Sequence, residues 1–189
     1  MQRSKPEQDH TSRHADAYLR SFAVQPIGVV RSPYTERFGT PRQPGVTDQV
    51  KGDARLPGRI ELRPEYAEGL AGLERFDRIW CLFLFHLNRG HGLTVRSPRD
   101  ARGAGADEHH GLFSTRSPHR PCPIGLSCLH LTGIEGHVLH VLGLDILDHT
   151  PVLDIKPYLP YADAFPDARV GWLEGRVPDE ADHFTPDRE

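Results

Sequence analysis

Two arginines lie in a proline-rich segment of the sequence, GLFSTRSPHRPCPIGLS, at residues 111–127. Each proline fixes φ, removes an amide donor and pushes the residue before it toward extended geometry, which excludes a regular helix here. Arg116 and Arg120 are therefore carried on a stiff loop. Two guanidinium groups held in this way suit the recognition of a planar anion, a carboxylate or a phosphate, by forked hydrogen bonds. A surface turn with solvated arginines is the alternative interpretation.

A second proline- and glycine-rich loop, FGTPRQPG at residues 38–45, carries Arg42 and Gln43. Both side chains are donors that could face an acceptor-rich ligand, although a plain turn has the same composition.

Carboxylates gather in a third segment, LDILDHTPVLDIKPYLPY, at residues 144–161. It places Asp145, Asp148, Asp154 and Lys156 near predicted strand ends, where charged residues serve either as site residues or as solvated surface groups.

Neither the cysteines nor the histidines have metal-ligand spacing. Cys81, Cys122 and Cys128 are odd in number and lack a CxxC pair, which favours reduced thiols. The twelve histidines are scattered and form no HExxH motif, so we expect no metal. His86 closes an apolar strand, where a backbone-bonded core histidine and a functional one are equally compatible with the sequence.

The elements that would position these residues are mostly strands. Residues 79–85, IWCLFLF, are apolar throughout, which predicts a strand buried on both faces. Residues 66–76 place apolar side chains at helical spacing and predict one short helix. The pattern favours an antiparallel barrel or sandwich in a single domain over a doubly wound sheet. Further strands are expected at residues 27–30, 59–62, 126–131, 138–147 and 152–155, with turns at 133–136 and 148–151.

Composition sets limits on organisation and partners. The chain has 189 residues, 23 basic against 26 acidic, so any contact with nucleic acid must be made by a local basic patch. We expect a flexible extension at 1–24, a folded domain at 25–172, a polar tail at 173–189 and a loop at 97–110. With no apolar run of about 18 residues and a polar N-terminus, a cytoplasmic protein is expected. No GxGxxG, GKS/T or GxSxG motif occurs.

Five motifs follow one another along residues 27 to about 172. They are IGVVRSPY (27–34), FGTPRQPG (38–45), GLERFDRIWCLFLFH (72–86), GLFSTRSPHRPCPIG (111–125) and LDILDHTPVLDIKPYLPY (144–161). With these motifs in this order, the chain resembles the TsaA-like proteins, also called YaeB or TrmO. That resemblance implies S-adenosylmethionine-dependent methylation of threonylcarbamoyladenosine next to the tRNA anticodon. It also implies a small antiparallel β-barrel with one or two short helices, working as a homodimer with the cofactor near the subunit interface.

The resemblance also assigns site residues. Arginines suit the cofactor's carboxylate, aspartates its ammonium and ribose hydroxyls, and Leu or Ile its adenine. The catalytic candidates, as possible bases for the acceptor nitrogen, are Asp145, Asp148 and Asp154. Expected substrate contacts are Arg31, Arg120, Cys122, Lys156 and Tyr158. The implied cofactor contacts are Pro41, Arg42, Gln43, His86, Leu87, Arg116, Leu126, Asp145, Ile146, Leu147, Asp148 and His149.

Two departures from the family pattern bear on the acceptor. Cys122 stands in RPCPIG where the family usually reads RPNPIG, and His149 stands in DHTP where it often reads DGTP. The chain also ends too early for the C-terminal domain of some longer bacterial members, and we expect it to lack that domain. Three alternatives stay open: methyl or other alkyl transfer to a small molecule, a non-catalytic cofactor- or RNA-binding regulator, and a structural β domain.

Overall fold

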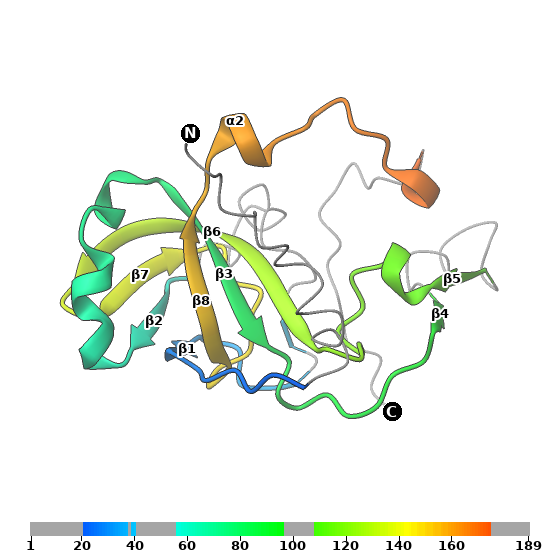
Figure 1. The fold of residues 1–189 in the computed structure, drawn as a ribbon, viewed down its shortest axis with the longest axis horizontal. Coiled ribbons are helices and arrows are strands. Elements are labelled where there is room, and N and C mark those ends of the chain that lie inside the picture. The colour runs from blue at the N-terminus through cyan, green and yellow to red at the C-terminus, as the bar shows by residue number, and fades with distance from the viewer. Residues whose placement is uncertain (1–20, 38, 41–55, 97–107, 175–189) are drawn as a thin grey trace, which may run out of the picture.

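A closed barrel forms the body of the protein in the computed structural model, which describes residues 21–37, 39–40, 56–96 and 108–174. Six antiparallel strands close it in the order β1-β2-β7-β6-β3-β8 (Figure 1). The predicted mostly-β, antiparallel barrel with short helices is thus confirmed. The strands are β1 (Gly28–Arg31), β2 (Gly58–Leu62), β3 (Arg78–Leu84), β6 (Ile124–Glu135), β7 (Val138–Leu142) and β8 (Pro151–Pro157).

The barrel interior is filled by alternate side chains of these strands. Strand β3 shows the pattern: Ile79, Cys81 and Phe83 are buried, whereas Trp80 and Leu82 are only partly buried. The prediction that this strand is buried on both faces is therefore wrong, because in a single barrel only the inward side of each strand faces the core. Its apolar outward residues remain on the barrel wall.

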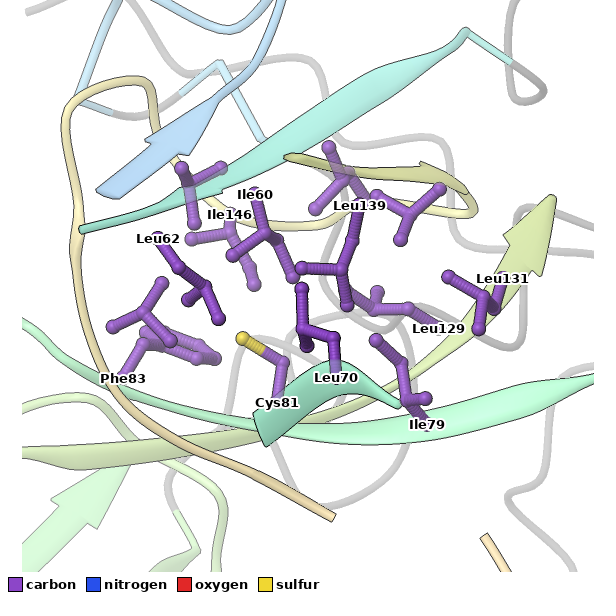
Figure 2. Close-up of a cluster of buried hydrophobic side chains, with 14 residues drawn as sticks. Ile60, Leu62, Leu70, Ile79, Cys81, Phe83, Leu129, Leu131, Leu139 and Ile146 are labelled. Carbon is purple, nitrogen blue, oxygen red and sulfur yellow. The ribbon is translucent and has the colours of Figure 1, made fainter. Parts of the chain in front are cut away.

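The core is mostly aliphatic, with Cys81 and Phe83 among its closely grouped side chains (Figure 2). Leu70 is buried among side chains of the barrel strands, although it comes from the segment between β2 and β3. The cluster includes Ile60 of β2, Ile79 of β3, Leu129 of β6 and Leu139 of β7, all without solvent exposure.

The predicted helix at 66–76 is wrong in type. The chain forms two 3-10 helices instead, η4 (Pro64–Leu70) and η5 (Leu73–Arg75). Gly72 between them has φ of 86°, a left-handed conformation that an α-helix cannot continue through. The apolar residues still reach the core, since Leu70 is buried and Leu73 packs against it.

Two strand boundaries also differ from those predicted. Strand β6 runs on to Glu135, so the turn predicted at 133–136 begins later, where Gly136 takes φ of 61°. Strand β7 ends at Leu142 rather than at 147, because Gly143 turns the chain with φ of 78°. Leu144 beyond that turn is buried in the core, which is why an apolar pattern alone extended the strand.

Five short elements lie outside the predicted set. A two-stranded sheet, β4 (Thr94–Arg96) with β5 (His109–Gly111), stands beside the barrel (Figure 1), and β5 replaces the end of the loop predicted at 97–110. The other three short elements are η7 (Leu112–Ser114), α2 (Pro160–Asp163) and η8 (Gly171–Leu173).

No helix in the described ranges is long and apolar enough to cross a membrane.

The antiparallel order gives the barrel two distinct ends. We call the loop end the one at which β1, β3 and β7 finish and β2, β6 and β8 begin, and the far end the opposite one. Four of the five motifs contain segments that enter or leave the barrel at the loop end.

Candidate functional site

A serine and an aspartate meet at the loop end of the barrel. Ser127 lies at an inward position of β6, almost fully buried, and its Oγ donates a hydrogen bond of 2.7 Å to Oδ1 of Asp145. Asp145 belongs to the segment between β7 and β8, just after the Gly143 turn. That turn brings the carboxylate back over the barrel interior, where it is partly buried.

Burial raises the pKa of the Asp145 carboxyl to about 6, and this outweighs the Ser127 hydrogen bond and the nearby Arg116 charge, which both lower it. The Arg116 side chain is exposed on the segment between β5 and β6, residues 112–123, which we call the arginine loop. The carboxyl therefore changes charge close to neutral pH, which suits a group that takes up or releases a proton.

Asp148 lies in the same segment but in a different environment. Its Oδ1 accepts a 3.0 Å hydrogen bond from the Ser32 amide, and its own amide donates to the Tyr34 carbonyl at 2.7 Å. These two contacts fix the turn before β8 to the end of β1. Asp148 thus holds together two of the motifs that are far apart in the sequence.

His149 follows with φ of 60°, in the left-handed region where glycine is favoured. Its ring connects two charged groups: Nδ1 is 2.9 Å from Nη1 of Arg31, and Nε2 is 3.2 Å from Oδ2 of Asp148. Arg31 also donates to Glu61 at 2.8 Å, and that hydrogen bond is the main cause of its raised pKa. Arg31, expected to contact substrate, is thus part of an ion-pair network beside the turn.

The two arginines of the proline-rich loop have different surroundings. Arg120 turns back on the loop, where its Nη1 donates to the Thr115 carbonyl at 3.0 Å and lies 3.5 Å from the carbonyls of Leu112 and Ser117. Arg120 therefore stiffens the loop. Arg116 is exposed and close enough to Asp145 to lower its pKa. Of the pair, Arg116 is the more exposed.

Of the other residues expected to contact the cofactor, three are exposed at the surface. His86 and Leu87 follow β3 and are exposed, and Leu126 is 55% exposed on the outer face of β6. Ile146 differs, because it is buried in the core and only its backbone faces the turn. Leu147 accepts a hydrogen bond from the Thr150 amide at 3.3 Å.

Three of the expected residues are not brought to the loop end. Lys156 and Tyr158 lie toward the far end of β8, where Tyr158 packs edge-on against Trp80 at 5.6 Å. Asp154 is on the outer wall and pairs with Lys156 at 2.7 Å. Cys122 is exposed on the arginine loop. Pro41, Arg42 and Gln43 lie outside the described residues.

Sequence reasoning missed Ser127 and Ser32 as partners of the two aspartates. Ser127 had a readable signal: it is the polar residue at an inward position of an otherwise apolar alternating strand, LSCLHL. Ser32 had none, because its contact is made by a backbone amide. Within the residues that the structure describes, no three His, Cys, Asp or Glu side chains are grouped to hold a metal ion.

Comparison with known proteins places the chain in a family. The tRNA-methyltransferase O N-terminal domain matches residues 29–164. The chain belongs to this family. Among its relatives is the tRNA (adenine(37)-N6)-methyltransferase of Escherichia coli K12, 41% identical over 162 residues, which cover 82% of this chain and 66% of that protein. The family predicted from the five motifs is thus confirmed.

Two other similar proteins extend the comparison. A probable S-adenosyl-L-methionine-binding protein of Pyrococcus abyssi is 39% identical over 82% of this chain and 78% of its own length. The crystal structure of TrmO from Pseudomonas aeruginosa superposes with a TM-score of 0.64 at 42% identity, over 81% of this chain and 63% of that one. This chain spans just under two thirds of the Escherichia coli relative and of the Pseudomonas structure.

Proposed function

We propose that this chain is an S-adenosylmethionine-dependent methyltransferase that acts on N6 of the adenosine next to the tRNA anticodon, with threonylcarbamoyladenosine as the acceptor. The names of its relatives, which include a tRNA (adenine(37)-N6)-methyltransferase and an S-adenosyl-L-methionine-binding protein, support the cofactor and the tRNA. The single structural observation that carries the proposal is the partly buried Asp145 carboxylate beside Arg116 at the loop end.

The donor set at the loop end fits this cofactor. Arg116 offers a cation for its carboxylate, and Asp145 offers an acceptor for its ammonium or ribose hydroxyls. Leu126 and Leu87, 55% and 46% exposed, offer apolar surface for adenine. When bound, the cofactor supplies an activated methyl group for in-line transfer. Pro41, Arg42 and Gln43 are proposed to add to this set.

The chain's own residues then have two tasks. The first is to hold acceptor nitrogen and methyl group in register, which the stiff arginine loop and the Asp148-fixed turn favour. The second is to remove the acceptor proton. Asp145 suits this second task, because a carboxyl with a pKa of about 6 is largely ionised at neutral pH and still basic enough to accept a proton.

We further propose a homodimer that works in the cytoplasm, where its tRNA substrate occurs. Apolar residues on the outer wall support the dimer: Leu126 is exposed on β6, opposite the partly exposed Leu82 of β3. A partner covering this wall would bury Leu126 next to the cofactor site. Sedimentation velocity at micromolar concentration should show twice the chain mass of 21.2 kDa. A tightly cofactor-binding monomer would contradict the shared site.

The function itself is tested on tRNA nucleosides. Purified protein, S-adenosylmethionine and tRNA containing threonylcarbamoyladenosine should yield a nucleoside heavier by one methyl group in mass spectrometry. The matched substrate is the same tRNA made without the threonylcarbamoyl group, on which little product is expected. Equal methylation of both tRNAs would reject the acceptor, and methylation of neither would reject the tRNA function in favour of a small-molecule substrate or a binding role.

A further inference from the structure

The arginine loop and the β4–β5 sheet form a locally basic surface. We call residues 85–96 and 108–120 the basic lobe, since these described residues contain four arginines and one glutamate in a chain of net charge −3. The lobe stands beside the loop end of the barrel (Figure 1). A polyanion approaching the candidate site would be attracted here rather than to the barrel as a whole. The arginines are Arg89, Arg96, Arg116 and Arg120.

A large aromatic side chain projects from the basic lobe. Phe113 of η7 is 72% exposed, although the preceding residue, Leu112, is buried. Its turn is firmly held: Trp172 of η8 donates from Nε1 to the Ser114 carbonyl at 2.8 Å, and its ring stacks on His110 at 4.0 Å. The ring is thus exposed on an ordered support, and this costs hydrophobic free energy unless something covers it.

Arg120 supports one side of this ring. Its guanidinium carbon is 5.4 Å from the centroid of Phe113, within cation–π range, while its Nη1 is bonded to the Thr115 carbonyl. The rest of the ring remains accessible. Arg116, which follows Phe113 by three residues, is the arginine that lies near Asp145. An aromatic face backed by a cation therefore stands on the same loop as the arginine that acts on Asp145.

We propose that Phe113 is a stacking platform for a tRNA base that neighbours the target adenosine. This inference rests on the proposed function and deepens it, because it names where the RNA is held. Bases stack on exposed aromatic rings in a sequence-tolerant way, and surrounding arginines neutralise the backbone phosphates. An apolar protein surface covering the ring would gain little from the arginines, whereas RNA offers both a base to stack on the ring and phosphates to pair with the arginines.

The test compares two exposed phenylalanines. Phe113→Leu keeps an apolar side chain but loses the flat face, and Phe165→Leu makes the same change at a residue that is 73% exposed outside the lobe. Affinity is measured by fluorescence anisotropy with a synthetic anticodon stem–loop RNA containing threonylcarbamoyladenosine. We expect Phe113→Leu to weaken RNA binding about fivefold or more. Phe165→Leu should leave it unchanged, and Phe113→Trp should retain wild-type affinity.

Two further measurements keep the result specific. Calorimetry with S-adenosylmethionine should give equal affinity for wild type and Phe113→Leu, which shows that the loop is intact. The stacking site would be overturned if Phe113→Leu bound the RNA with wild-type affinity. It would also be overturned if Phe113→Leu had a lower sedimentation coefficient than the wild type, because Phe113 would then be a subunit contact. Neither result would affect tRNA methylation by the wild type. If the wild type neither binds nor methylates the RNA, the proposed function and the stacking site both fall.

Discussion

The two ends of the barrel are built from the same six strands but place their carboxylates in different environments. At the loop end Asp145 is partly buried, and the pKa of its carboxyl rises to about 6. Near the far end Asp163 accepts hydrogen bonds from the Leu159 amide at 2.8 Å and the Trp80 indole at 2.9 Å, and these lower the pKa of its carboxyl. One end keeps a carboxyl ready to exchange a proton, and the other uses a carboxylate with a lowered pKa to fasten α2 to β3.

The largest effect that separates the two ends should be on methyl transfer. Asp145→Asn keeps an acceptor for Ser127 but removes the base, so the single-turnover rate on threonylcarbamoylated tRNA should fall about a hundredfold or more. Asp163→Asn, the control at the far end, should leave the rate near wild type.

The pH dependence of the methyl-transfer rate should also differ between the two ends. A base must be ionised to accept a proton, so the wild-type rate should fall as the pH is lowered through about 6, the pKa of Asp145. Asp145→Asn should lack this step and Asp163→Asn should retain it. If Asp145→Asn kept the wild-type rate and its pH profile, Asp145 would be a structural residue only.

A smaller effect concerns stability and uses two glycines of one strand. A Cβ on Gly125, near the loop end of β6, would clash with the Phe83 ring, whereas one on Gly133, further toward the far end, would have nothing within 4 Å. Gly125→Ala should therefore lower the free energy of unfolding by about 1–3 kcal/mol through overpacking. Gly133→Ala should leave it unchanged or raise it by up to about 1 kcal/mol.

Urea unfolding followed by circular dichroism measures both variants. The contrast would fail if the two substitutions had equal effects, which would mean that the Phe83 ring moves aside at little cost.

The sequence predicted the barrel because its strands alternate or run apolar in short segments with clear turns between them. It failed at residues 66–76, where helical spacing was right for burial of Leu70 but Gly72 stopped an α-helix. It also failed for β4 and β5, three residues each, which pair across a long intervening segment. Such short strands carry too few residues for a periodic signal.

The candidate site was predicted in part for a different reason. Motif order assigned Asp145, Asp148 and Arg116 to the site, and the fold brings the segments that carry them to one end. Sequence could not distinguish Arg116 from Arg120, because only the folded loop shows that Arg120 is occupied by backbone carbonyls. The sequence also could not show which of Asp145 and Asp154 is buried. In the fold the Asp145 carboxylate is shielded from solvent, whereas that of Asp154 is exposed on the outer wall of the barrel.

Closure of the barrel has a consequence for how the protein behaves at high concentration. Strands β1 and β8 pair through Gly28 with Val152 and Val29 with Pro151, so the six-stranded sheet has no open edge. An open edge is the template on which sheets of separate molecules join and aggregate. Among the described strands, only β4 and β5 have one unpaired side, and three residues are too few to recruit another chain. If the β1–β8 seam opened, it would expose edges longer than those of β4 and β5, so this short seam protects the protein against aggregation.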